Sequence, residues 1–442
     1  MRFIQTIKNI FKIEDLRARL LYTFGIILIY RLGKYITLPG IDPSQLAGLK
    51  SQTNSGIMGL LDMFSGGAFS QASIFALGIM PYISASIVVQ LLGIVFPYFQ
   101  KLQKEGESGR RKLNQYTRYL TVLILILQGP TYLFNLTRTL PSTAFVLSGT
   151  FFQISSVIML TAGTIFVMWL GEKITDKGIG NGISLIIMIG IVARMPANFI
   201  FELGSRMNGA GGAIALIVEI VFLFIVILGT ILLVQGTRRV PVQYARRIVG
   251  NKQYGGVRQY IPLKVNAAGV MPIIFAQAIM MLPIIIAGYS NSTSGFVIAF
   301  SNMYGFWYNL VTGLLIIVFT YFYTAITINP VQMAEDMKKN GGFIPGIKPG
   351  RKTVEFIDTI MSRITLPGSI FLAIIAILPS IAVKTGVSSQ FAQFYGGTSL
   401  LILVGVVLDT LQQIESHLLM RHYDGLMKSG RVKGRTGAVS AY

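Results

Sequence analysis

The stretch GIMGLLDMFSGGAFSQASIFALGIMPYISASIVVQLLGIV, from Gly56 to Val95, contains two apolar segments of different kinds. The first, 56–69, is interrupted by Asp62 and by the residues Ser65-Gly66-Gly67. It is too short to cross a bilayer, which takes roughly 20 apolar residues. The sequence therefore predicts a re-entrant or half-inserted segment here.

The second segment, 73–95, is long enough to span a membrane but contains Gly78 and Pro81 in mid-course. Proline removes a backbone hydrogen bond, and in lipid this loss is tolerated mainly where the helix faces protein or a water-filled cavity. A short buried segment that leads into a kinked, cavity-facing helix predicts a gated pathway.

The composition is that of a polytopic membrane protein. Of the 442 residues, 52% are apolar and only 12% are charged, which is about half the usual charged share of a soluble domain. The net charge is +21, large for so few charged residues. The chain contains no cysteine, which excludes disulfides, thiolate chemistry and cysteine-ligated metals.

Apolar runs of spanning length predict ten transmembrane helices. They lie at about 20–38, 73–95, 118–137, 151–170, 180–200, 213–235, 265–289, 306–329, 366–383 and 398–419. Residues 1–19 are charged and amphipathic, which predicts an interfacial helix before a retained first span. Residues 420–442 form a basic tail.

Lys and Arg are concentrated in alternate loops, after the second, sixth and eighth predicted spans. The positive-inside bias makes these loops cytoplasmic, and with ten spans both termini are cytoplasmic as well. The opposite loops carry little beyond Lys50, Arg138 and Arg206.

Two cytoplasmic loops, about 236–264 and 330–365, are longer than a connection between spans requires. Proline and glycine indicate shaped loop tips. Their charge has two interpretations: topology with attraction to anionic lipid, or a docking surface for a polyanionic or acidic partner. The docking candidates are Arg238, Arg239, Arg246, Arg247, Lys252, Lys348 and Arg351.

Signals for enzymatic chemistry are nearly absent. The sequence has no HExxH, GxSxG or Walker A pattern, and GGFIPGIKPG lacks the GK[ST] ending of a phosphate loop. His417 and His422 lie at or beyond the cytoplasmic end of the last span. No catalytic residue, metal or cofactor is predicted, so the chain is not expected to be an enzyme.

Four charged residues lie within or at the ends of predicted spans: Arg31, Lys34, Glu219 and Asp409. Intramembrane charges often mark ion or proton pathways. These four form no evident relay, which favours a structural role by pairing or snorkelling. A secondary transporter is the leading alternative function, and an intramembrane enzyme, which would need a catalytic pair, is the second.

Isoleucines recur at one-turn spacing on two predicted helices. Ile79 and Ile83 share a face of the second span, and Ile183 and Ile187 repeat the spacing after the glycine-rich run 178–182. On periodicity alone these residues indicate ordinary packing or lipid contact.

Several motifs resemble the SecY family (SecY/Sec61-alpha) of protein-conducting channel subunits. They are SGGAFSQASIFALGIMPYISAS at Ser65, KEGESGRRK at Lys104, MWLGEKIT at Met168, GIGNGIS at Gly178, PLKVNAAGVMP at Pro262, NGGFIPGIKPG at Asn340 and YGGTSLLI at Tyr395. They follow the family order and cover nearly the whole chain.

The resemblance implies a hydrophobic pore ring. Its positions fall on Ile79, Ile83, Ile183, Ile187, Ile274 and Ile402. Such a ring binds nothing tightly, so an extended chain slides through, and it closes to ions by dewetting. The resemblance also implies a plug at about 56–70, represented by Leu61, Asp62, Met63, Phe64, Ser65 and Gly66. Its glycines and serines predict a movable, loosely packed segment.

The resemblance further implies a lateral gate between the second and third spans and the seventh and eighth. Gln90 and Asn266 match its polar positions. Interhelical hydrogen bonds in membranes are worth roughly 1 kcal/mol, so such a latch is weak enough for a signal sequence to displace. Lys348 stands where the family leads us to expect arginine, and lysine lacks the planar fork for bidentate contact.

The implied fold is all-α, with ten transmembrane helices around a central hourglass pore. Spans 1–5 (20–200) and 6–10 (201–419) would form two inverted, pseudo-symmetric halves. The implied function is a passive channel in the bacterial plasma membrane for unfolded polypeptides and signal sequences, with lateral release into lipid. The implied partners are SecE, SecG, the SecA motor ATPase, the ribosome and membrane lipids, without specific DNA binding.

Overall fold

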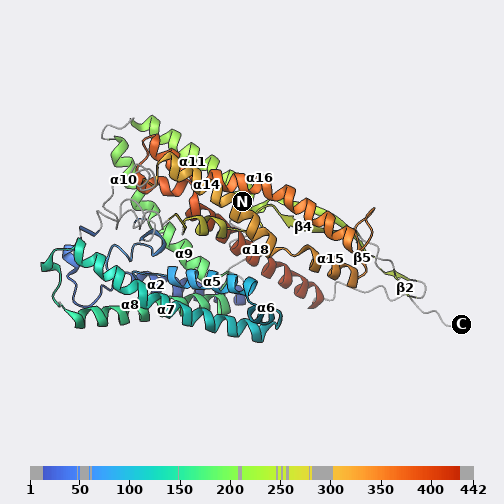
Figure 1. Ribbon diagram of the computed structural model, residues 1–442, viewed down its shortest axis with the longest axis horizontal. Helices are drawn as coiled ribbons and strands as arrows, with labels where there is room; N and C mark the ends of the chain where they lie inside the picture. The colour runs from blue at the N-terminus through green and yellow to red at the C-terminus, as the bar shows by residue number, and fades with distance from the viewer. Residues whose placement is uncertain are drawn as a thin grey trace. The chain divides into compact units, whose positions relative to one another are not determined.

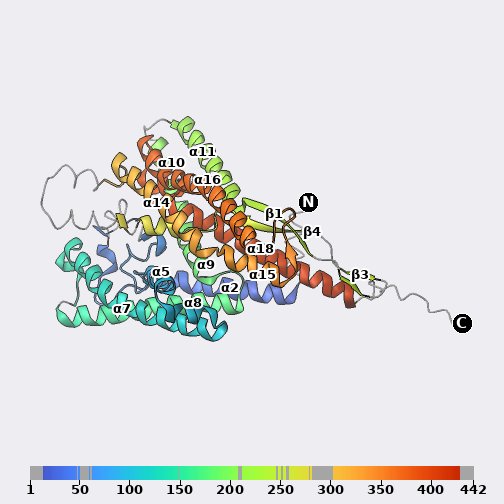
Figure 2. The ribbon, with the colours of Figure 1, turned by 45° about the vertical axis from the view of Figure 1, so that its right-hand side comes forward.

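The computed structural model describes residues 13–46, 48–49, 59, 62–147, 149–207, 212–244, 247–249, 252–254, 258–277, 279–280 and 302–428 (Figure 1, Figure 2). Its contacts divide the chain into two compact units. Unit 1 comprises Met1–Thr53, Ile57–Ala193 and Val406–Tyr442, and unit 2 comprises Asn54–Gly56 and Arg194–Gly405. Each unit has an apolar core of its own.

The chain is an all-α polytopic membrane protein, as predicted. Seven helical segments in the described residues are long and apolar enough to span a bilayer, and a bent pair makes an eighth. The seven are α7 (Glu107–Thr139), α8 (Thr150–Lys177), α9 (Gly182–Val192) with α10 (Met195–Met207), α11 (Gly212–Gln235), α14 (Phe306–Thr327) with α15 (Pro330–Lys339), α16 (Arg351–Lys384) and α18 (Gly397–Lys428).

Of the other two predicted spans, the first is fully described and the seventh only in part. Helix α2 (Glu14–Gly33) corresponds to the first span, and residues 1–12 of the predicted interfacial helix lie outside the described residues. Of the seventh span, 265–289, residues 271–277 and 279–280 are helical and most of the remainder lies outside the description. The tail after residue 428 also lies outside it.

The second predicted span differs from the expectation. Residues 73–79 form turns, and helix α5 (Met80–Val95) begins just before Pro81, so the prediction of a kink in mid-span is wrong. Proline suits the first turn of a helix because its missing N–H would have no intrahelical acceptor there. The chain bends instead by 104° between α5 and α6 (Pro97–Lys104), where Pro97 holds Phe96 in an extended conformation.

In unit 1, helices α7 and α8 lie side by side, and α2, α5 and α9 pack against them or each other (Figure 1, Figure 2). Helix α2 ends at Gly33, earlier than the predicted limit of 38; residues 34–35 form a turn, and Thr37 then pairs with Ser73. Ile36 O accepts a hydrogen bond from Ile74 N at 3.0 Å, and Leu38 N donates one to Ala72 O at 2.8 Å. Short 3-10 helices, η1 (Pro43–Gln45) and η2 (Ser142–Ala144), lie in the loops.

In unit 2, α14 and α16 lie side by side in both views (Figure 1, Figure 2). The core packs α11, α14, α16 and the start of α18 around Leu233, Ile316, Leu372, Ile375 and Leu401. The short helices α17 (Ser389–Ala392) and η3 (Gln393–Tyr395) connect α16 to α18. The predicted fifth span is two helices, α9 and α10, which belong to different units.

The two long basic loops form a small sheet that the sequence analysis did not predict. Strands β4 (Arg258–Lys264), β1 (Thr237–Tyr244) and β5 (Gly342–Phe343) lie in that order, all antiparallel. A separate hairpin joins β2 (Arg247–Val249) to β3 (Lys252–Tyr254). The sheet packs on α15 and the start of α16 through Val240, Val242, Leu263, Met337, Ile344, Ile357 and Met361.

Both long strands of this sheet contain proline. Pro241 faces Tyr260 and Pro262 faces Arg239 in the β1–β4 register. Val265 N donates to Gly236 O at 2.9 Å, so the alternating antiparallel pattern places both prolines in pairs that exchange no hydrogen bonds. The β1–β4 ladder therefore needs no N–H from either proline. The backbone nitrogen of each proline points away from the partner strand.

Substitution of Gly163 tests the close packing of α8 on the turn at Ile74. A Cβ at position 163 would overlap the Ile74 carbonyl oxygen, which belongs to the backbone and has little freedom to move. We expect Gly163→Ala to lower stability by about 1–3 kcal/mol, measured as a lower melting temperature of the purified protein.

Gly25→Ala is the matched control, because a Cβ on this residue of α2 meets nothing within 4 Å. It should change stability by no more than about 1 kcal/mol. Equal melting temperatures for the two variants would contradict the close contact.

Candidate functional site

The predicted plug is described from Asp62 onward, and Leu61 lies outside the described residues. Residues 62–64 are helical and 65–70 form turns, with Gly66 and Gly67 at φ of 65° and 87°. Every residue from 62 to 70 is buried. The segment is packed in this structure, unlike the loose packing that its glycines and serines predicted.

Asp62 organises the segment from within. Its side chain is fully buried, and Oδ1 accepts a hydrogen bond from Ser70 N at 2.7 Å. Its carbonyl oxygen accepts from Gly67 N at 2.7 Å and from Ser65 Oγ at 3.1 Å. The acidic residue that interrupts the apolar sequence therefore supplies acceptors to backbone groups that no helix satisfies.

Glycine permits a close approach between this segment and α9. A Cβ on Gly66 would lie 3.0 Å from Gly190 Cα, and a Cβ on Gly190 would lie 3.2 Å from Gly66 N and from Phe64 O. The hydroxyls of Tyr30 and Tyr132 and the guanidinium of Arg31 also contact it. Arg31, for which a structural role by pairing or snorkelling was predicted, donates to a backbone carbonyl of the predicted plug.

Four of the predicted ring isoleucines lie in unit 1 and two in unit 2. Ile83 N donates to Ile79 O at 3.1 Å, so these residues are one turn apart, and Ile183 and Ile187 are one turn apart on α9. Ile79 and Ile187 are buried, with 2% and 5% of their surface exposed. Ile274 and Ile402 are half-buried and buried, respectively, and the ring of six remains a prediction.

The predicted gate residues differ in their surroundings. Gln90 is exposed on α5. Asn266 lies in the turn after β4, and its Oδ1 is buried without a hydrogen-bond partner among the described residues.

The structure brings the two basic loops together. Strand β5 pairs with β1 through Gln243–Phe343 and Tyr244–Gly342, which joins the loop after α11 to the loop after α15. Arg238, Arg239, Lys348 and Arg351 are exposed on this joint body. Arg247 and Lys252 lie on the β2–β3 hairpin, and Arg246 lies outside the described residues.

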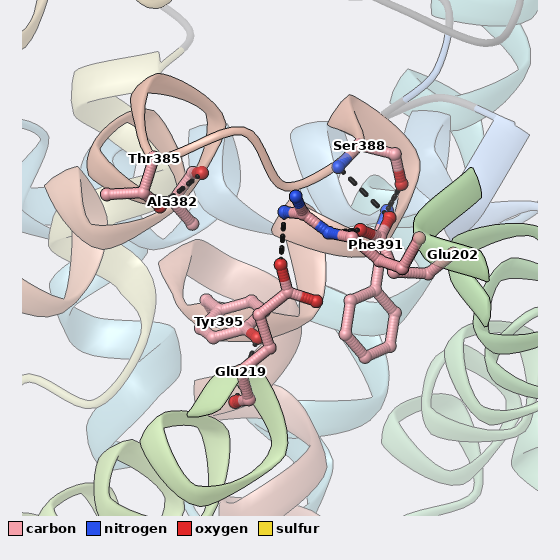
Figure 3. A network of polar contacts seen from close by, with 8 residues as sticks. Glu202, Glu219, Ala382, Thr385, Ser388, Phe391 and Tyr395 are labelled. Carbon is pink, nitrogen blue, oxygen red and sulfur yellow. Dashed lines mark hydrogen bonds and ion pairs between the residues drawn. The ribbon is translucent and has the colours of Figure 1, made fainter. Parts of the chain in front are cut away.

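A buried ionic cluster in unit 2 was missed by the sequence analysis (Figure 3). Arg206 Nε donates to Glu202 Oε1 at 3.1 Å, and Arg206 Nη2 pairs with Glu219 Oε1. Glu202, Arg206 and Glu219 expose 1%, 6% and 8% of their surface. The i, i+4 spacing of Glu202 and Arg206 is the one signal that could have indicated their pairing.

The cluster joins four segments of unit 2. Ser388 N donates to Glu202 Oε2 at 3.0 Å, and the Tyr395 hydroxyl donates to Glu219 O at 2.9 Å. Burial, followed by the charge of Glu219, raises the pKa of Tyr395, so its hydroxyl keeps its proton and remains a donor. Glu219 therefore has the structural role predicted for it, and it connects α10 and α11 to the connection between α16 and α18.

Comparison with known proteins identifies the family of this chain. The SecY family model matches residues 73–411. The protein translocase subunit SecY of Corynebacterium glutamicum is 45% identical over 438 residues, which cover 95% of this chain and 98% of that protein. The chain belongs to the SecY family. The SecY of Mycobacterium tuberculosis is 42% identical over 457 residues, covering 96% of this chain and 99% of that protein.

Solved structures similar to this chain have the same fold. A structure described as that of a protein conducting channel has a TM-score of 0.61 and 18% identity, covering 90% of this chain and 92% of that chain. Sec61 in the canine ribosome–channel complex has a TM-score of 0.56 and 17% identity, with the same coverage. The SecY-family fold of a multi-pass membrane channel thus agrees with the described helices.

Arg206 and Glu219 should contribute unequally to stability. Arg206→Gln would leave two buried carboxylates without their shared cation, whereas Glu219→Gln keeps Arg206 paired with Glu202. We expect Arg206→Gln to cost about 3–5 kcal/mol and Glu219→Gln to cost clearly less, measured by thermal unfolding of the purified protein.

Arg111→Gln provides the control, because the paired side chains of Arg111 and Glu107 on α7 are 79% and 81% exposed. An exposed pair contributes about 0–1 kcal/mol. Equal losses of stability for Arg206→Gln and Arg111→Gln would show that the buried cluster stabilises the protein no more than an exposed ion pair does.

Proposed function

We propose that this chain is the central channel subunit of the general secretory translocon. It would pass unfolded polypeptides across the bacterial plasma membrane and release transmembrane segments sideways into lipid. The observation that carries the proposal is identity of 45% over nearly the full length to proteins named protein translocase subunit SecY. The channel performs no chemistry of its own, and energy comes from a cytoplasmic partner.

In this proposal the six isoleucines line the narrowest part of the pore. Branched apolar side chains offer no hydrogen bonds, so they retain no particular substrate sequence and resist the leakage of ions when no chain is present. The segment 56–70 closes the pathway. The burial of residues 62–70 supports this role, because a segment that seals a channel must exclude water around itself.

The same proposal assigns lateral release to a gate that includes Gln90 and Asn266. The buried Asn266 Oδ1 supports this role, because it is an acceptor without a partner among the described residues. A buried acceptor without a partner is stabilised by a hydrogen bond from any donor that reaches it. A single hydrogen bond of this kind is weak enough to be replaced by one to another donor.

Ion conductance in planar bilayers tests the channel proposal. We compare the wild-type complex with a variant that lacks residues 56–69. The wild type should be silent, and the deletion should give large, flickering, poorly selective currents, because the apolar ring alone closes the pathway incompletely. Absence of current from both, with saturable uptake of a small solute, would instead favour a secondary transporter.

We also propose that the joint body of the two basic loops docks SecA or a ribosome in the cytoplasm, and that SecE and SecG complete the membrane complex. With these loops in the cytoplasm and ten spans, both termini would also be cytoplasmic. The exposed basic residues and their convergence through the β1–β5 pairing support this role. A relative, Sec61, is described in a ribosome–channel complex.

Charge reversal tests the docking surface. The double variant Arg238→Glu/Arg239→Glu should weaken binding of purified SecA to proteoliposomes by about tenfold, because like charges then face the partner. Lys384→Glu is the control: Lys384 is exposed at the opposite end of α16 from Arg351 and should leave binding unchanged. Equal weakening by both variants would indicate a general charge effect.

A further inference from the structure

Side chains from two helices distant in sequence hold the segment 62–70 in place. The Tyr30 hydroxyl on α2 donates to Ser65 O at 3.3 Å, and Arg31 Nη1 donates to Gly66 O at 3.3 Å. The Tyr132 hydroxyl on α7 donates to Phe69 O at 3.0 Å. All three acceptors are backbone carbonyls, so these contacts depend on the position of the segment and not on its side chains.

The segment itself is closed by its own hydrogen bonds. Besides the bonds to Asp62, Ser65 Oγ accepts from Phe69 N at 3.1 Å, and Ser70 Oγ donates to Gly67 O at 3.2 Å. Because these bonds connect its two ends and its middle, the segment keeps its shape when its contacts to α2 and α7 are lost.

The chain after the segment is fixed by other contacts. Leu38 N donates to Ala72 O, Ile74 N donates to Ile36 O, and Ser73 Oγ donates to Gly33 O at 3.2 Å. Between the two parts lies Ala72, at φ of 45°, the non-glycine residue with positive φ among the described residues. Two backbone hydrogen bonds cross this junction, from Ala72 N to Phe69 O at 3.2 Å and from Ser73 N to Ala68 O at 3.1 Å, and both must open for the segment to leave.

We propose that Tyr30, Arg31 and Tyr132 are positioning residues that hold the segment 62–70 in its closed position. We call these three residues the latch. Loss of their hydrogen bonds lets the segment leave as one body about Gln71–Ala72, while 73–74 stay attached to 33–36. This inference rests on the plug role proposed above. It adds that the closed state is set by hydroxyl and guanidinium donors on the scaffold, acting on the backbone of the segment.

Cysteine labelling tests the latch, because the chain contains no cysteine of its own. Ser70→Cys places a thiol in the buried segment, and its modification by a water-soluble maleimide reports how often the segment opens. Removal of one neutral hydrogen bond by Tyr30→Phe or Tyr132→Phe should raise this rate about fivefold. The ring of Tyr132, 4.8 Å from that of Phe69, is kept.

Two controls separate the latch from general loosening. Tyr323→Phe removes a buried hydroxyl on α14 that has no partner among the described residues, and it should leave the Ser70→Cys rate unchanged. Ala76→Cys, at a buried position beyond the junction, should stay slow in the Tyr30→Phe and Tyr132→Phe backgrounds. Unchanged Ser70→Cys rates in those backgrounds, or an equal rise with Tyr323→Phe or at Ala76→Cys, would overturn the proposal.

Conductance of the same variants separates this inference from the proposed function. If the 56–69 deletion conducts, the Tyr30→Phe/Tyr132→Phe pair should conduct more often than the wild type, and silence of the pair overturns the latch. If labelling accelerates but the deletion is silent, the latch holds and the plug role fails.

Discussion

Backbone hydrogen bonding in the absence of water is the constraint on which this structure depends. A helix satisfies its own N–H and C=O groups, but the chain at 34–38 and 62–79 is not helical beyond a single turn and must find partners elsewhere. It does so by pairing 36–38 with 72–74, and by using Asp62, Ser65 and Ser70 as local acceptors and donors. This irregular backbone is stable because the surrounding residues of unit 1 supply its hydrogen-bond partners.

This constraint explains why the fold class followed from the sequence but the details did not. Long apolar runs require helices in lipid, so α11 and α14 lie close to their predicted ranges, and α7 and α8 contain theirs but extend beyond them. The ends of helices respond to contacts distant in sequence. Helix α2 ends at Gly33, and the residues that follow it pair with 72–74. Only the structure shows that Pro81 lies at the start of a helix.

The missed features likewise arise from long-range contacts. Glu202, Arg206 and Glu219 lie near one another in sequence, but Ser388 and Tyr395 reach the cluster from a segment far along the chain. The sheet formed by the two basic loops joins residues 237–264 to 342–343 through an apolar cluster that includes Val242 and Ile357. Its strands are short and rich in charge, so they lack the hydropathy signal that predicted the spans. Arg238 and Lys348 were each predicted as docking residues, but nothing in their local sequence indicated that one body carries both.

The outward prolines of the sheet formed by the two basic loops matter for a protein proposed to handle unfolded chains. An extended polypeptide exposes a continuous row of backbone donors and acceptors and adds readily to an open strand edge. Pro262 removes the outward N–H at the middle of the edge strand β4, and Pro241 removes one from the part of β1 that β5 does not pair with, so a passing chain finds an interrupted row on both strands. The sheet is thereby protected from capturing the translocon's own cargo as an extra strand.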